Sequence, residues 1–298
     1  MKKLPLVLLV IVSLFVLAGC HGDKQYDDLL QQADSIMNID DDSAKVAIKL
    51  LDKAKPQLND FSKAQRMRYQ LLYHKAMNKA DILFSSDSIM KNVVAYYEKH
   101  GTSNERMLAY YMLGCVYRDI HEAPMALEYY NKATEQADTT SQDCDYATLC
   151  RIYGQMGILF EKQFLPYQEL GALDKAVKYA YFAKDTLNAL RYYQNKNSAY
   201  DFLGKKDSAI IINLKAANLF RKHGYDYDAN IAFGCNYIYY IDNKNYPKAK
   251  EAFEAYQSTN YQGNTNYDDS KAFLLYEKGL YYMFMNNLNI AYTCLQQI

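Results

Sequence analysis

The feature that most constrains this chain is a pattern of small and aromatic residues that recurs at helical spacing. The clearest copy spans residues 107–140, where one face of an expected first helix carries Tyr110, Leu113, Gly114 and Tyr117. A turn with Pro124 follows, and one face of an expected second helix carries Ala126, Tyr130 and Ala133. We expect Gly114 to face Ala126, because two helices that cross closely leave no room for larger side chains.

The pattern recurs along almost the whole chain, with decay. The aromatic residues near the ends of successive first helices are Tyr117, Phe160, Tyr200, Tyr240 and Tyr282, at intervals of 43, 40, 40 and 42 residues. Weaker copies precede them around residues 69–96 and 28–51. Some copies depart from the pattern, because Asn197 and Tyr237 replace the small residue of the first helix. About seven helical hairpins are therefore predicted.

Residues 107–140 match the pattern W-x2-L-G-x2-Y…A-x3-F, with Tyr110 in the place of Trp, and so resemble a tetratricopeptide (TPR) repeat. The resemblance implies an all-α, right-handed α-solenoid over residues 25–298. The intervals exceed the usual period of about 34 residues, so longer turns or linkers are expected, and another kind of α-solenoid stays open. For the insert at 161–175, we expect a longer first helix and a turn at Pro166.

The first twenty residues resemble a bacterial lipoprotein signal. Lys2 and Lys3 precede an apolar run over residues 6–17, which is too short to span a membrane as a helix. The run leads into Leu17-Ala18-Gly19-Cys20. The resemblance implies removal of residues 1–19, acylation of Cys20, a tether over residues 20–24, and attachment to a membrane of the bacterial cell envelope, inner or outer. An ordinary signal peptide or a short anchor helix is the alternative.

Residues 34–130 are also similar to TPR lipoproteins and regulators of Bacteroidetes. The motifs that carry this similarity are Ala33-Asp34-Ser35-Ile36-Met37, Asp87-Ser88-Ile89-Met90 and Ala109-Tyr110-Tyr111-Met112-Leu113-Gly114. In that family a transmembrane helix and an output domain sometimes follow the repeats, and we expect neither within these 298 residues. Because Ile298 falls inside the second helix of the last unit, without a polar capping helix, we expect an incomplete last repeat in a truncated family member. The alternative is that a partner covers Leu295 and Ile298.

The sequence offers little for catalysis. Lys+Arg and Asp+Glu both number 34, which argues against a nucleic-acid reader. Five histidines without HxxH or HExxH spacing support no metal site, and nucleophile, phosphate and dinucleotide motifs are absent. We therefore expect no enzyme activity, no cofactor and no metal. The cysteines after Cys20 are expected to be small buried residues, with a Cys144–Cys150 disulfide as the alternative in an exported protein.

The remaining candidate site is the concave surface, which first helices line in the TPR family. Exposed positions beside the packing residues are predicted to contact a protein or peptide partner. They are Gln70, His74, Tyr111, Arg118, Arg151, Arg191, Gln194, Asp201 and Tyr276. The predicted function is a membrane-anchored interaction scaffold. The alternatives are the sensing part of a signalling regulator and an accessory for outer-membrane assembly or transport.

Overall fold

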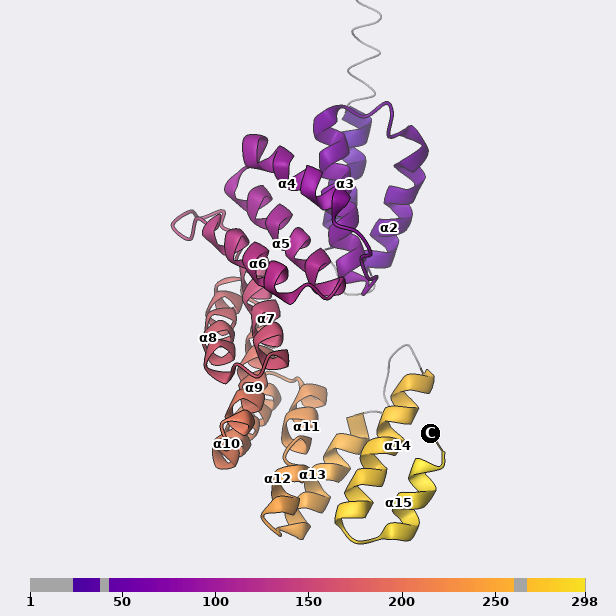
Figure 1. Ribbon diagram of the computed structural model, residues 1–298, viewed down its shortest axis with the longest axis vertical. Helices are drawn as coiled ribbons and strands as arrows, with labels where there is room; N and C mark the ends of the chain where they lie inside the picture. Colours follow the sequence, from indigo (N-terminus) through magenta and orange to yellow (C-terminus); the bar gives the residue numbers. More distant parts are fainter. Residues whose placement is uncertain (1–23, 38–42, 260–266, 298) are drawn as a thin grey trace, which may run out of the picture. The chain divides into compact units, whose positions relative to one another are not determined.

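The computed structural model describes residues 24–37, 43–259 and 267–297, and these residues form helices and turns without a strand (Figure 1). The predicted signal over residues 1–19 and Cys20 in its tether lie outside the described residues. The chain divides into two compact units, Met1–Asp145 and Tyr146–Ile298.

The first unit contains three helical hairpins. A helix over residues 24–36 pairs with α2, α3 pairs with α4, and α5 pairs with α6. The bounds are α2 Ser43–Ala54, the short 3-10 helix η1 Lys55–Gln57, α3 Lys63–Lys79, α4 Ser88–His100, α5 Ser103–Asp119 and α6 Ala123–Glu135.

The second unit contains four hairpins, in which α7 pairs with α8, α9 with α10, the broken helix α11–α12 with α13, and α14 with α15. The bounds are α7 Tyr146–Lys162, α8 Pro166–Phe182, α9 Thr186–Phe202, α10 Lys206–Lys222, α11 Asp226–Gly234, α12 Tyr237–Asp242, α13 Tyr246–Thr259, α14 Tyr267–Phe284 and α15 Leu288–Leu295. The two units together hold seven hairpins, as predicted.

Glycines, which have no side chain, let the paired helices approach each other. A Cβ atom on Gly114 would lie 2.5 Å from Cε1 of Tyr130 and 3.3 Å from the carbonyl oxygen of Ala126. The predicted Gly114–Ala126 crossing is therefore confirmed, and the fully buried Tyr130 ring fills the notch. Gly157 receives Leu173 in the same way, with 2.9 Å from a built Cβ to Cδ2.

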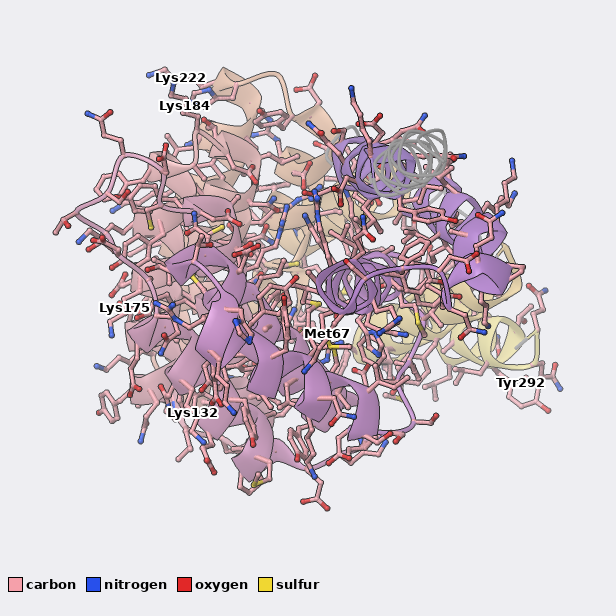
Figure 2. All side chains as sticks on the ribbon, turned by 90° about the horizontal axis from the view of Figure 1, so that it is seen from above. Met67, Lys132, Lys175, Lys184, Lys222 and Tyr292 are labelled. Atoms are coloured by element: carbon pink, nitrogen blue, oxygen red, sulfur yellow. The ribbon has the colours of Figure 1, made fainter. Side chains whose placement is uncertain are left out.

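A recurring left-handed turn closes hairpins and also joins one hairpin to the next, as at Lys184 and Gly224. Among the described residues, eight have positive φ angles: Asp81, His121, Phe164, Lys184, Gly204, Gly224, Lys244 and Asn286. At Lys184 the backbone N–H bonds the carbonyl of Tyr181, and the next N–H bonds that of Ala180, which is a Schellman motif. Glycine is absent at six of these eight positions, and Lys184, one of the six, is exposed at the surface (Figure 2).

These turns explain the spacing of the aromatic residues. The helices α7, α8, α9 and α10 each have 17 residues, and three residues separate each from the next. For the two 40-residue intervals the predicted longer turns are therefore wrong, because the additional length lies in the helices. In the 43-residue interval from Tyr117 to Phe160 a longer linker is confirmed, because residues 136–145 separate α6 from α7. For the insert at 161–175, the turn before Pro166 is confirmed. The first helix α7 is no longer than α9, and the second helix α8 absorbs the insert.

The first helix of the sixth hairpin breaks between α11 and α12, next to Asn236. Asn236 is fully buried, and its Oδ1 accepts a hydrogen bond of 3.0 Å from Nδ2 of the equally buried Asn213. The second polar atom of each amide has no partner among the described residues. Burying an amide atom without a hydrogen-bond partner costs free energy that an apolar residue at position 236 would not cost. The helix thus breaks next to Tyr237, where the sequence departs from the repeat pattern.

The notch at Gly114 predicts opposite effects for the same substitution at two glycines. Gly114→Ala should lower the free energy of unfolding by about 1–3 kcal/mol, because the methyl group collides with Tyr130. Gly171→Ala in α8 should raise it by about 0.5–1 kcal/mol, because nothing lies within 4 Å and alanine favours helix. Urea unfolding followed by circular dichroism measures both, and equal effects would contradict the notch.

Candidate functional site

The predicted contact residues of the second unit share one register on their helices. Arg151 and Arg191 lie thirteen residues before the left-handed residue of their own turn, Gln194 and Tyr276 ten before, and Asp201 three before. Separations of three, seven and ten residues place side chains on one helix face. Arg151, Arg191, Asp201 and Tyr276 are exposed and Gln194 is half-buried. The structure therefore leaves this face of α7 and α9 open.

Two arginines and a tyrosine gather where α7 meets α9. Nε of Arg191 lies 2.7 Å from Oδ1 of Asp228 in α11. Arg151 has no ion pair among the described residues. A Cβ atom on Gly154, one turn after Arg151 in α7, would lie 2.9 Å from the hydroxyl oxygen of Tyr192. Burial raises the pKa of Tyr192, while the charges of Arg151 and Arg191 lower it. We name Arg151, Arg191, Tyr192 and Asp228 the arginine cluster.

Tyr192 is a member of this cluster that the sequence analysis missed. Its ring lies over Gly154 of α7, and a Cβ atom there would be 2.8 Å from Cζ of Tyr192. Gly154 lies ten residues before its turn residue, at the register of Gln194. A glycine at an exposed register is the signal that could have pointed to a large neighbour.

The predicted exposure of Tyr111 is wrong. Its side chain is 4% exposed, and its ring lies 5.8 Å from that of Tyr130. Nine of the seventeen residues of α5 are buried, on all sides of the helix. A helix buried all round keeps no open face, so the register that is exposed on α9 is covered on α5.

Arg118 holds the first unit together and is not a free contact residue. Its guanidinium lies 2.7 Å from Oδ1 of Asp119, whose side chain is 4% exposed, and 3.0 Å from Oδ1 of Asn78 in α3. The other oxygen of Asp119 accepts a hydrogen bond from the backbone N–H of Phe84. Arg118 thus connects α5 directly to α3, and through Asp119 to the segment before α4.

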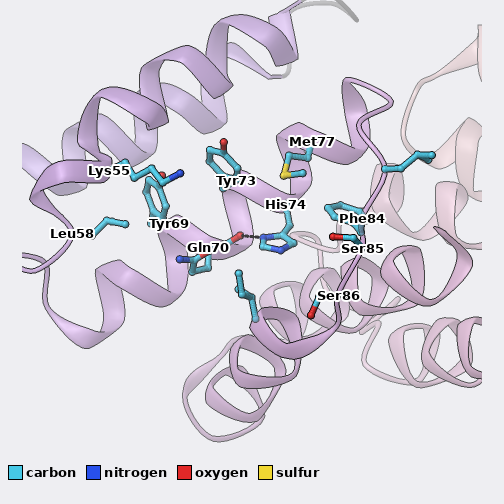
Figure 3. A pocket seen from close by; sticks show the side chains of 12 residues that line it. Lys55, Leu58, Tyr69, Gln70, Tyr73, His74, Met77, Phe84, Ser85 and Ser86 are labelled. Carbon is cyan, nitrogen blue, oxygen red and sulfur yellow. Dashed lines mark hydrogen bonds between the residues drawn. The ribbon is translucent and has the colours of Figure 1, made fainter. Parts of the chain in front are cut away.

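Gln70 and His74 do not join the arginine cluster, which belongs to the other unit. They line a cavity of about 290 Å³ between α3 and residues 83–89, together with Tyr69, Tyr73, Met77 and Phe84 (Figure 3). His74 is buried, and Gln70 is half-buried. The two residues therefore form part of a pocket, not of an open face.

A buried carboxyl was also missed. Glu169 in the first turn of α8 is 1% exposed, and burial raises its pKa to about 7. Oγ of Ser198 in α9 contacts Oε1 of Glu169 and also lies 2.9 Å from the carbonyl oxygen of Asn195. One hydroxyl hydrogen serves one acceptor, so a protonated Glu169 that donates to Ser198 satisfies both contacts.

No cluster of three or more metal-ligating side chains occurs in the part of the chain that the structure describes. None of the helices in that part is long and apolar enough to cross a membrane. Cys144 and Cys150 do not form a disulfide bond in this structure, so the alternative is not realised here. Cys150 is buried, and its thiol donates to the carbonyl of Ala147.

Comparison with known proteins identifies the fold. No protein-family model and no curated protein sequence matches the chain. Among solved structures, the apo form of the quorum sensor NprR from B. thuringiensis aligns with a TM-score of 0.61 at 13% identity, over 92% of this chain and 75% of that one. BtubC (BKLC) from P. vanneervenii aligns with a TM-score of 0.55 at 13% identity, over 78% of this chain and 89% of that one.

A third structure, a variant of a putative kinesin light chain with nearly identical TPR-like repeats from Podosopora anserina, has a TM-score of 0.51 at 14% identity. The alignment covers 67% of this chain and 96% of that one. The fold is therefore that of a TPR-like helical solenoid, and identities this low establish the fold alone.

Two arginines that the sequence analysis predicted as contact residues should differ in their effect on stability. Arg118→Ala should lower the free energy of unfolding by about 2–3 kcal/mol, because it leaves the buried carboxylate of Asp119 without its cation. Arg151→Ala should change it by less than about 0.5 kcal/mol, because that side chain is exposed. The urea midpoints of unfolding of the two variants test this difference. Similar losses of unfolding free energy in both variants would refute the structural role of Arg118.

Glu169 predicts a loss of stability with rising pH. Its folded-state pKa of about 7 exceeds the ordinary value of 4.5, so its contribution is complete below pH 4.5 and disappears as the pH rises through 7. The loss should reach about 3 kcal/mol at most. Urea unfolding at several pH values should show this slope in the wild type and a smaller one in Glu169→Gln. Equal slopes would contradict a buried neutral carboxyl.

Proposed function

We propose that this chain is an exported, lipid-anchored protein whose TPR-like solenoid binds a segment of another protein at the arginine cluster and does not act as a catalyst. The observation that carries the proposal is the exposed guanidinium of Arg151, without an ion pair among the described residues, beside the Tyr192 hydroxyl. An arginine that is not committed to the fold keeps all its N–H donors for a partner.

The neighbours of Arg151 define what the partner must supply. The Arg191–Asp228 pair is partly exposed and offers a cation beside an anion. Half-buried Gln194, one turn further along α9, adds an amide that donates and accepts. This combination suits an extended segment whose backbone carbonyls and at least one carboxylate face α7 and α9. Rim contacts of this kind contribute orientation and association rate more than affinity.

The lipid anchor is supported by the sequence of residues 2–20. Two lysines, an apolar run and Leu-Ala-Gly-Cys in this order match the signal that directs lipid to Cys20. Two or more acyl chains give stable membrane attachment, where one chain is marginal. The helix that begins at residue 24 follows Cys20 closely, so the first hairpin would start near the membrane surface.

Anchoring predicts a cysteine-specific label in bacterial cells that express the full chain. With an alkyne-tagged fatty acid in the medium, the wild type should become labelled and should sediment with membranes. Cys20→Ser should lose the label, because no other residue in this proposal receives the lipid. Cys144→Ser, at a half-buried cysteine in the first unit, is the matched control and should keep it. A label that persists in Cys20→Ser would refute the anchor.

The arginine cluster predicts site-specific crosslinks. A photoreactive amino acid at position 194 should capture one protein from intact cells, because this position lies on the open face of α7 and α9. The same amino acid at position 151 replaces the arginine itself, so it should capture the protein more weakly. The same amino acid at position 222, where Lys222 projects from the end of α10 (Figure 2), should not capture it.

Introducing Arg151→Glu should weaken the crosslink from position 194 at least tenfold, because a carboxylate then faces the partner's carboxylate. Arg151→Lys should weaken it less, since lysine keeps the charge and loses the planar fork. Crosslinks of the same strength from positions 194 and 222 would show that this face is not the binding surface.

A second candidate is the sensing part of a signalling regulator. The specific observation is the TM-score of 0.61 with a structure described as a quorum sensor. In that case the captured segment would be a signal peptide and the chain would pass its binding on to an output protein. A crosslinked species of a few kilodaltons at most would favour the sensing role, and a folded envelope protein would favour the scaffold.

A further inference from the structure

The second hairpin, α3–α4, differs from its neighbours at the position where helices normally meet. Gly114, Gly157 and Gly279 each lie seven residues before the left-handed residue of their turn, and a side chain of the following helix fills each notch. In α3 the same register carries His74, seven residues before Asp81. Asn197 in α9 and Tyr237 in α12 also replace glycine at this register, so the α3–α4 hairpin is distinguished by His74 together with the longer connection that follows it.

The connection to the second helix is also longer in this hairpin. In the other hairpins with such a turn the second helix begins two residues after the left-handed residue, as α6 does at Ala123 after His121. Helix α4 begins only at Ser88, seven residues after Asp81, and packs more extensively on α5 than on α3. The additional residues 83–86 line the space that remains, which is the cavity of about 290 Å³.

The additional segment is fixed at both ends. The backbone N–H of Phe84 donates to the carboxylate of Asp119, and the carboxylate of Asp87 accepts a hydrogen bond of 2.9 Å from the hydroxyl of Tyr117. Both partners belong to α5, whose position depends on the fully packed α5–α6 hairpin. The cavity is therefore held open by the fold.

The cavity wall is largely aromatic and includes an unused acceptor on His74. Nδ1 of His74 lies 2.7 Å from the carbonyl oxygen of Gln70, so it carries the hydrogen and Nε2 is left as an acceptor. Burial lowers the pKa of His74, which keeps the ring neutral. The ring stacks on Phe84 at a centroid distance of 5.3 Å, and Nε2 has no hydrogen-bond partner among the described residues.

We propose that this pocket binds one neutral aromatic side chain with an N–H or O–H donor, tryptophan or tyrosine, from the protein segment that the solenoid captures. The ring would lie among Tyr73, Met77 and Phe84 with its donor on Nε2 of His74 (Figure 3). The inference rests on the proposed capture of a protein segment. The volume is at the small end for ligand sites, which favours one side chain over a cofactor.

The mouth of the pocket favours a side chain that is part of a peptide over a free small molecule. Leu83 is 74% exposed and Ile89 is 44% exposed, and both line the pocket. These apolar side chains can cover residues that flank the inserted ring, which a free indole or phenol does not have. Lys55 is exposed and also lines the pocket, so a cationic side chain is disfavoured.

The chain contains no tryptophan, so indole fluorescence reports only an added probe. N-acetyl-tryptophanamide added to the detergent-solubilised full chain should show a saturable blue shift and a higher anisotropy. N-acetyl-tyrosinamide should compete, and N-acetyl-phenylalaninamide, which lacks the side-chain donor, should compete about tenfold less well. Absence of saturable binding would overturn the proposal.

Two variants isolate the acceptor. His74→Phe keeps a ring that can stack on Phe84 and removes Nε2, so the affinity should fall about tenfold or more. His223→Phe makes the same change at a histidine that stacks on Tyr225 in the other unit, and should bind like the wild type. Equal binding by both variants would overturn the role of His74.

A measurement on the wild type avoids dependence on how the variant folds. The ¹⁵N resonance of His74 Nε2 should shift when the probe donates to it, and an unchanged resonance at saturation would overturn the proposed contact. A tripeptide Leu-Trp-Leu with blocked ends should bind about tenfold more tightly than indole. Equal affinities would identify a site for free aromatics and overturn the peptide origin.

These probe experiments need no partner protein, so they fail independently of the crosslinking at positions 151 and 194. Probe binding without crosslinks would contradict binding at the arginine cluster and support the pocket. Crosslinks without probe binding would support capture of a protein segment and contradict the aromatic anchor in the pocket.

Discussion

The close crossing of paired helices at positions without a side chain is the contact on which the fold depends. Where Gly114 meets Tyr130, a ring with no exposed surface occupies the space that a Cβ atom would need. The same arrangement recurs at Gly157 with Leu173 and at Gly279 with Leu295. Each hairpin buries its apolar residues against itself and its sequence neighbours, so the chain folds as a series of local contacts.

The left-handed turns convert this pairing into a regular repeat. Because each turn bonds back to the carbonyl of a residue such as Tyr117, Phe160 or Tyr200, the aromatic residue near the helix end also marks the hydrogen-bonded end of the helix. The aromatic intervals near 40 residues are therefore the repeat length. Longer linkers were expected because these intervals exceed the usual period of about 34 residues. Six of the eight left-handed residues in the described part of the chain are not glycine, so the short turns could not be recognised from sequence.

The number of hairpins and the Gly114 notch could be predicted from sequence, because they depend on residues close together in the chain. The surface could not be predicted as well. Tyr111 and Gln194 share one register, yet α5 is buried all round and α9 is not. Arg118 and Asp201 also share a register, but only Arg118 has a buried carboxylate and a neighbouring segment to hold. Exposure depends on what packs from outside the repeat, and a repeat pattern contains no such information.

A solenoid can open one hairpin at little cost to the others, because each repeat contacts only its neighbours. His74 at a glycine register and the longer connection to α4 open the α3–α4 hairpin, and Arg118, Asp119 and Tyr117 of the next hairpin fix the opened segment. Arg118 of α5, which was predicted as a contact residue, thus supports a pocket one repeat away. A departure from the repeat pattern at a packing position, followed by a longer connection, is the sequence signal for such a pocket.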